Sequence, residues 1–270
     1  MEVYDICILP LCLKNIEMGG SNMRKKRLIV LITVVVIILV LLGFNGRFGN
    51  PLSRHLVEKA AAEYLSENFS DLDVYIEDVT YDAKTGNYHA NVKSPSSVDT
   101  HFTIAVSMTG HVSHDTYHNV LYGYNTFTRI DEAYSAMVKP VLTNTELPYT
   151  LRWCLGGLEI TYRQNSTGYA RAHLIMEDLE LDKDYDVAEL GRQAGYLSVY
   201  VYDETVTSER AAEILMDIKA RFDAAQVPFY AVSLTLCAAE GSDDVVHITD
   251  FPYAQISENG LSDKIRNYTE

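Results

Sequence analysis

The sequence predicts an α+β protein in which one membrane-anchoring helix is followed by two folded modules. Three observations lead to this prediction: an uncharged apolar stretch near the N-terminus, a helical repeat followed by alternating strands, and a later strand, helix and strand in succession. Apolar residues make up 47% of the 270 residues, which is enough to build a hydrophobic core. The composition therefore excludes intrinsic disorder of the whole chain.

The apolar stretch covers residues 28–46, which contain no charged side chain. A helix of this length is about 28 Å long, close to the roughly 30 Å hydrocarbon core of a bilayer. Arg24-Lys25-Lys26-Arg27 directly precedes it, so the positive-inside rule predicts that residues 1–27 lie in the cytoplasm. A cleaved signal peptide is the alternative interpretation, but no A-x-A-like cleavage site follows the stretch. We expect residues 1–22 to be an artefact of start-site choice ahead of Met23.

Charge is distributed unevenly along the chain. The formal net charge is −15, and residues after position 44 contain 17 Lys+Arg against 34 Asp+Glu. Nucleic-acid binding needs clustered basic side chains, and this chain has too few of them for nucleic acid to be an expected partner. The acidic surface favours cationic partners or divalent ions instead.

Residues 47–143 predict the first extracytoplasmic module. Asn50-Pro51 is typical of a helix N-terminus, and Leu52, Leu56 and Ala60 recur at helical spacing after it. Alternating strands follow over 74–76, 88–92 and 102–108. One helix followed by an antiparallel sheet resembles the cystatin-like arrangement. A long helix over 120–141 is expected to close this module, with residues 144–148 as the linker.

Residues 149–270 predict a second α+β module. Strands are expected over 151–155, 158–162, 170–176 and 197–201. Thr207 can cap a helix that extends to Phe222, and a strand over 230–236 follows. A strand, a helix and a strand form a βαβ crossover, so the two strands should be parallel. A short helix around Leu261 and Ile265 ends the chain.

Several segments together carry a resemblance to a known family. The chain resembles the YfjL-like family of Gram-positive bacterial membrane proteins in the order of four segments. These are the apolar stretch, Gly49-Asn50-Pro51, Asp71-Leu72-Asp73 and Val92-Lys93-Ser94-Pro95-Ser96-Ser97-Val98-Asp99-Thr100-His101-Phe102. The similarity extends over nearly everything from Met23 onward. It implies a membrane location and two modules, and it implies no catalytic residue because the family has no assigned activity.

Histidines are concentrated in the first module, between a predicted strand and the predicted long helix. If a helix begins near Ser113, His114 and His118 lie one turn apart and could share a Zn²⁺ ion, with His101, His111 and Asp115 nearby. The alternative is a polar turn with solvated histidines. No glutamate follows the first histidine, unlike in zinc proteases with the H-E-x-x-H motif.

An acidic run over 177–186 places Asp182, Asp184 and Asp186 at the spacing of an EF-hand calcium loop. The pattern fails because Val187 stands where glycine is needed and Gln193 where a bidentate glutamate is needed. We therefore expect these acids to lead into a helix that starts at Val187, whose N-terminus favours negative charge.

Ser97, Asp99 and His101 supply the residue types of a hydrolase triad, together with Ser96. In an extended segment they would be about 7 Å apart on one face, too far for direct proton relay. No Gly-x-Ser-x-Gly elbow is present. The segment from Ser94 to Ser97 is better interpreted as a turn whose hydroxyls bind backbone groups.

Two further groups of residues leave alternatives open. Cys154 and Cys237 could form a disulfide outside the cell or remain two buried thiols. Tyr196, Tyr200 and Tyr202 could form a peptide-binding face or contribute to core packing.

The predicted function rests on the predicted membrane location and on the absence of a complete catalytic or metal-binding motif in the sequence. We expect a membrane-anchored extracytoplasmic binding, sensing or scaffolding protein, held by the lipid bilayer through residues 28–46 and contacting a protein or peptide partner outside. No catalytic, cofactor-binding or metal-binding residue is assigned. The competing hypothesis is a metal-assisted extracytoplasmic enzyme that uses His111, His114 and His118.

Overall fold

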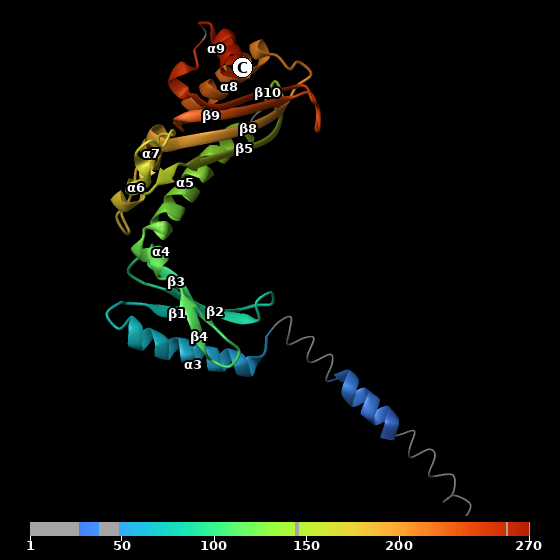
Figure 1. Cartoon of the computed structure of the whole chain (residues 1–270), viewed down its shortest axis with the longest axis vertical. Helices are drawn as coiled ribbons and strands as arrows, with labels where there is room; N and C mark the ends of the chain where they lie inside the picture. Colours follow the sequence, from blue (N-terminus) through green and yellow to red (C-terminus); the bar gives the residue numbers. More distant parts are fainter. Residues whose placement is uncertain (1–26, 38–48, 144–145, 258, 270) are drawn as a thin grey trace, which may run out of the picture. The chain divides into compact units, whose positions relative to one another are not determined.

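The computed structural model describes residues 27–37, 49–143, 146–257 and 259–269 (Figure 1). The chain forms two compact units. Among the described residues, the first unit comprises 27–37, 49–70, Ile76–Asn91 and Ile104–His114, and the second comprises Asp71–Tyr75, Val92–Thr103 and the described part of 115–269. The structure confirms the predicted α+β class.

Residues 27–37 are helical and exposed. The remainder of the predicted membrane span, residues 38–46, lies outside the described residues, as do residues 1–26. Within the part of the chain that the structure describes, no helix combines the length and the apolar character needed to cross a bilayer.

The first unit begins with helix α3 (Pro51–Asn68), as the sequence predicts. The Asn50 side-chain oxygen accepts a hydrogen bond from the Ser53 amide at 2.7 Å, and Pro51 occupies the first helical position. This pairing satisfies an amide that would otherwise have no partner at the helix N-terminus. Every fourth side chain, Val57, Ala61 and Leu65, is buried on one face of the helix.

A four-stranded sheet follows, with the strands in chain order: β1 (Tyr75–Asp82), β2 (Asn87–Lys93), β3 (His101–Val106) and β4 (Val112–Asp115). Alternation sends Tyr88, Ala90 and Val92 of β2 into the core. Strand β4 was not predicted, because the sequence there favours a turn and a helix beginning near Ser113. Instead the segment pairs with β3, and the Ser113 hydroxyl donates to the Ala105 carbonyl at 3.0 Å.

The second unit contains α4 (His118–Leu121) and the long helix α5 (Tyr124–Thr143). We expected α5 to close the first module, but it belongs to the second unit. Its buried stripe, including Ile130, Tyr134 and Val138, packs into the core of that unit. Pro140 does not end the helix, which continues to Thr143.

A mixed sheet forms the centre of the second unit, in the order β10-β9-β8-β5 (Figure 1). Strands β8 (Gly195–Tyr202) and β9 (Ala231–Cys237) are parallel, and helix α8 (Ser208–Ala225) connects them. This arrangement confirms the predicted βαβ crossover, including Thr207 as the cap of α8. Strands β5 (Thr150–Leu158) and β10 (Val245–Pro252) are antiparallel to their neighbours.

Helices α5, α8 and α9 (Leu261–Thr269) bury their apolar side chains against one face of this sheet. The core side chains of β8 are Leu197, Val199 and Val201, at alternate positions. The remaining elements of the unit are short: β6 (Ile160–Thr161), α6 (Arg163–Ser166), β7 (Leu174–Ile175), the 3-10 turns Met176–Asp178 and Tyr253–Gln255, and α7 (Val187–Ala194). The strand expected over 170–176 is reduced to β7, which pairs in parallel with β6.

Candidate functional site

The face of the second sheet opposite its core carries a row of aromatic side chains. Because β8 alternates, Tyr196, Tyr200 and Tyr202 point away from the core that its other residues fill. Of the two interpretations of these tyrosines, the structure supports a surface for Tyr200 and Tyr202, which are partly exposed. Tyr196 is 9% exposed and therefore mostly buried.

Strand β5 extends this row at the edge of the sheet. Trp153 lies opposite Tyr200 in the register, and their ring centroids are 5.5 Å apart. The Tyr200 and Tyr202 rings are 5.4 Å apart in an edge-on arrangement. Trp153 is 38% exposed and Leu155 is 62% exposed on β5. We call the surface formed by Trp153, Leu155, Tyr200 and Tyr202 the aromatic face.

Polar groups continue this surface across β9 and β10. Thr235 lies beside Tyr200, and His247 lies beside Thr235. The Thr235 hydroxyl is 3.0 Å from His247 Nδ1, and the Thr249 hydroxyl is 3.2 Å from His247 Nε2. The sheet therefore presents aromatic rings at one edge and hydroxyl and imidazole groups toward the other.

Arg171 covers the Tyr196 end of the sheet. Its guanidinium carbon is 4.2 Å from the Tyr196 ring centroid, and its nitrogens bind Asp250 at 2.6 and 2.8 Å. A third interaction pairs it with Glu159. The hydrogen bond to Asp250 raises the pKa of Arg171 above its ordinary value. Arg171 thus covers the Tyr196 end of the sheet, whereas the aromatic face is exposed at the Tyr202 end.

Acidic side chains gather at the Tyr202 end. Tyr202 lies beside Cys237, which lies beside Val245, so the turn between β9 and β10 leaves the sheet at this end. That turn, residues 238–244, contains Glu240, Asp243 and Asp244 and no basic side chain. We call residues 238–244 the acidic turn.

The two cysteines differ in their position on the sheet. Cys154 lies opposite the core residue Val199, whereas Cys237 lies beside Tyr202 and its Sγ is 3.3 Å from the Tyr200 hydroxyl. Both are free thiols, so the buried-thiol interpretation is correct. Burial raises the pKa of Cys154 to about 12, and the hydrogen bond to Cys237 raises the pKa of Tyr200 to about 12.

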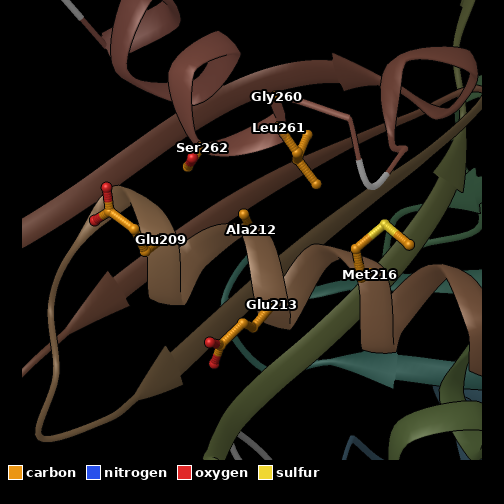
Figure 2. A pocket seen from close by; sticks show the side chains of 7 residues that line it. All are labelled: Glu209, Ala212, Glu213, Met216, Gly260, Leu261 and Ser262. Atoms are coloured by element: carbon orange, nitrogen blue, oxygen red, sulfur yellow. The ribbon is translucent and has the colours of Figure 1, made fainter.

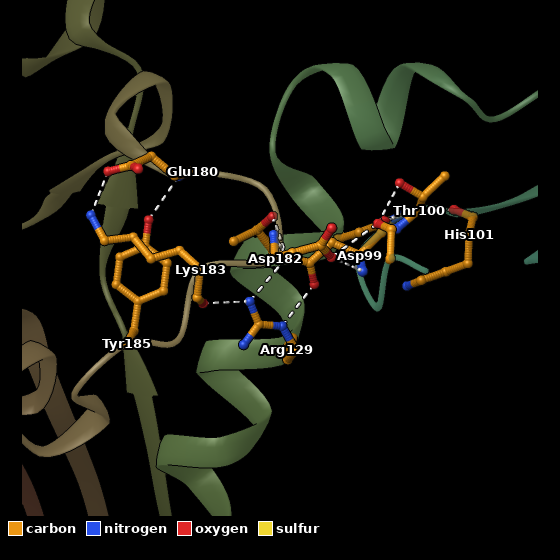
Figure 3. Close-up of polar contacts among 11 residues, drawn as sticks. Asp99, Thr100, His101, Arg129, Glu180, Asp182, Lys183 and Tyr185 are labelled. Atoms are coloured by element: carbon orange, nitrogen blue, oxygen red, sulfur yellow. Dashed lines mark hydrogen bonds and ion pairs between the residues drawn. The ribbon is translucent and has the colours of Figure 1, made fainter. Parts of the chain in front are cut away.

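Two segments singled out in the sequence meet in the second unit around Asp99, which is 1% exposed (Figure 3). Arg129 binds the Asp99 carboxylate with two nitrogens, at 2.7 and 3.0 Å. The Thr126 hydroxyl donates to the same carboxylate at 2.8 Å, and the Asp182 amide at 2.9 Å. We call Asp99, Thr126, Arg129 and Asp182 the Asp99 cluster.

The Asp99 cluster is occupied by its own contacts. Asp182 is in the left-handed region with φ 58°, and its carboxylate accepts from the Ser97 hydroxyl and the Asp99 amide, both at 2.9 Å. Burial alone would raise the pKa of Asp99, but the hydrogen bonds from Arg129, the Asp182 amide and Thr126 outweigh it and hold the pKa below its usual value. Asp99 thus directs its carboxylate to these donors rather than to His101.

Two acids of the 177–186 run, Asp182 and Asp186, have structural roles. Asp182 belongs to the Asp99 cluster, and Asp186 caps α7 by accepting from the Glu189 amide at 3.1 Å. Helix α7 begins at Val187, as predicted from the charge leading into it.

The histidine pair expected on one helix is not formed. His114 lies on β4 and His118 is the first residue of α4, while His111 precedes β4. Their spacing is therefore not that of neighbours on a helix, because the segment before Asp115 pairs as a strand. Over residues 27–37 and the described parts after 48, no three His, Cys, Asp or Glu side chains are grouped so that they could hold a metal ion.

A groove of about 490 Å³ lies between α8 and the start of α9 (Figure 2). Glu209, Glu213 and Met216 of α8 line one side, and Leu261 lies opposite. Both carboxylates already have partners, since Arg266 binds Glu209 and Arg210 binds Glu213, each at 2.7 Å. Because both carboxylates of the groove are already in ion pairs, we take the aromatic face as the candidate site.

Comparison with known proteins gives two family matches. Residues 24–116 match the model described as the YfjL-like N-terminal domain, and residues 133–266 match the YfjL-like C-terminal domain. No curated protein and no solved structure matches significantly. The aromatic face lies within the C-terminal match.

Proposed function

The chain belongs to the YfjL-like family, and from that premise we propose that it is a membrane-anchored extracytoplasmic binding protein whose ligand lies on the aromatic face. Residues 28–46 would anchor it in the bilayer, with the N-terminus in the cytoplasm and both units outside the membrane. The uncharged stretch and the four cations before it support this location.

One observation carries the binding role: Trp153, Leu155, Tyr200 and Tyr202 form a contiguous apolar and aromatic surface on two paired strands of the sheet. Large side chains of this kind are usually buried, and when gathered on a surface they mark interaction sites. Tyrosine and tryptophan also offer a polar group at the edge of an apolar ring, which suits recognition in contact with water. The face lacks the paired acid and base groups that general acid–base catalysis requires.

The proposal is tested by site-specific photocrosslinking in intact cells. A photoreactive phenylalanine analogue replaces Tyr202 in one variant and Tyr268 in a control. Tyr268 is also an exposed tyrosine of the second unit but lies on α9. We expect a defined adduct from position 202 that is absent from position 268 and is lost when Trp153→Ala is added. Equal labelling at both positions, or labelling unaffected by Trp153→Ala, would show that the aromatic face is not the binding surface.

A further inference from the structure

Strand β5 is an end strand of its sheet. It pairs with β8, and among the described strands none pairs with its other edge. In an antiparallel pair, residues whose backbone groups point to the partner alternate with residues whose groups point away. The outer edge of β5 therefore presents a line of backbone donors and acceptors beside the aromatic face.

Asp131 of α5 shows which residues point outward. Its carboxylate accepts a hydrogen bond from the Leu158 amide at 2.6 Å, so this amide points away from β8. By alternation, the backbone groups of Gly156 and Cys154 point the same way. Asp131 covers the end of the edge at Leu158, and burial raises the pKa of this carboxyl. The regular part of the outer edge that no described strand pairs with thus runs from Trp153 to Gly156, because the register shifts between Leu151 and Trp153.

We propose that this edge binds an extended, basic peptide segment of a partner protein, which adds to the sheet as a fifth strand next to β5. The inference rests on the proposed function and names the class of ligand for the same face. Backbone hydrogen bonds to β5 would supply affinity, and alternate side chains of the peptide would contact Trp153 and Leu155.

Charge selects the occupant. The acidic turn, which is separated from β5 by β8, and Glu204 lie at the end of the sheet where β5 begins. The basic side chains at this end are Arg152 of β5 and Arg210, which is paired with Asp203 and Glu213 and binds the Pro148 carbonyl. Acidic groups exceed basic ones at this end, and the whole chain has a net charge of −15. A second copy of the chain would therefore be repelled, whereas a peptide rich in lysine or arginine would be attracted.

Trp153 provides the readout, because it is the chain's one tryptophan. The full chain in neutral detergent micelles is titrated with a peptide of about ten residues in which lysine alternates with valine or phenylalanine. We expect a saturable change in Trp153 fluorescence. A peptide with glutamate in place of lysine should cause none. A lysine peptide whose alternate backbone amides are N-methylated keeps its charge and side chains but cannot pair with β5, and it should bind about tenfold more weakly or less.

Leu155→Lys tests the edge from the protein side. The side chain is exposed, so folding should be preserved, and an added charge on an edge strand opposes strand addition. The matched control is Leu121→Lys, at a similarly exposed leucine on α4. We expect about tenfold weaker binding for Leu155→Lys and unchanged binding for Leu121→Lys.

The outcomes separate the two proposals. Equal binding of the methylated and unmethylated peptides would overturn strand addition but leave the aromatic face as a binding surface. A Trp153 response to soluble cell-wall oligosaccharides with none to the lysine peptide would also overturn the peptide class alone. If position 202 gives no specific crosslink in cells either, the proposed function itself is wrong.

Discussion

Asp99 and Asp182 exchange hydrogen bonds in both directions. The Asp182 amide donates to Asp99 Oδ2 at 2.9 Å, and the Asp99 amide donates to Asp182 Oδ1 at 2.9 Å. Arg129 completes the arrangement by binding the Asp99 carboxylate and the Lys183 carbonyl, the latter at 2.9 Å. Two loops separated by 83 residues are thus fixed to each other and to helix α5.

Replacing Asp99 with asparagine should destabilise the second unit. The variant removes the negative charge and turns an amide nitrogen toward Arg129 or the Asp182 amide, both of which are donors. Breaking a buried pair by removing one partner costs about 3–5 kcal/mol, and the 30% exposure of the Arg129 side chain reduces this to about 2 kcal/mol. Urea unfolding followed by Trp153 fluorescence measures the effect.

The control for this prediction is Asp178→Asn. Asp178 pairs with Arg163 at the surface, where both side chains are more than half exposed. Surface ion pairs contribute little, so its unfolding free energy should stay near that of the natural chain. Equal losses in the two variants would contradict the assigned role of the Asp99 cluster.

The Asp99 cluster should also make stability depend on acid pH. Because the pKa of Asp99 in the folded chain lies below its ordinary value of 3.8, the unfolded chain binds more protons in this range. The stabilisation is present above about pH 4 and is lost as pH falls through the folded pKa. Between pH 5 and 3, the Asp99→Asn variant should therefore lose less stability than the natural chain. If the unfolding free energies of the variant and the natural chain fell equally over this pH range, Asp99 would not be the source of the pH dependence.

Cys154 and Cys237 should remain unpaired in the protein as it occurs in cells. Strand β8 lies between their strands, and their partners on β8, Val199 and Tyr202, are three residues apart, which places their backbones roughly 14 Å from each other. The side chains also lie on opposite faces of the sheet. A disulfide needs Cα atoms within about 7 Å. Alkylation after denaturation without reductant, followed by peptide mass spectrometry, should label both cysteines. Recovery of a linked Cys154–Cys237 peptide pair would refute the register.

Gly156→Ala should strain the packing of α5 on β5. The added Cβ would lie 2.5 Å from Val138 Cγ2, and Val138 is fully buried on α5. Overpacking of this kind costs about 1–3 kcal/mol. Combining Gly156→Ala with Val138→Ala should cost less than the two single losses added together, as unfolding of all three variants will measure. Additive losses would mean that the two residues do not touch.

Placing two charges in the proposed span should abolish membrane anchoring. Val35→Asp combined with Val36→Asp adds charge to the middle of the span, and one central charge costs about 2.5–3.5 kcal/mol on the insertion scale. Membrane fractionation should then recover the protein in the soluble fraction. In the natural chain, a reporter active only outside the cell should function after Glu270. Activity of a cytoplasmic reporter alone would invert the proposed orientation.

Local signals in the sequence were sufficient for several elements. Asn50 and Pro51 define the start of α3, Thr207 caps α8, and the acids before Val187 lead into α7. Each depends on hydrogen bonds or charges within about four residues, which can be recognised without knowledge of the rest of the chain. The alternation of β8 likewise separated its core side chains from Tyr200 and Tyr202.

Tertiary structure decided which distant segments meet. Residues 112–115 form β4 rather than a helix because β3 offers a pairing edge, and α5 joins the second unit because β5 covers its apolar stripe. Trp153 reaches Tyr200 only through the register of β5 on β8. Composition and periodicity specify that a residue is buried or exposed, but strand register and long-range hydrogen bonds depend on how whole elements pack. For that reason the sequence could propose a tyrosine face and a turn from Ser94 to Ser97, while packing added Trp153 to the first and brought Asp182 to the Ser97 hydroxyl at the end of the second.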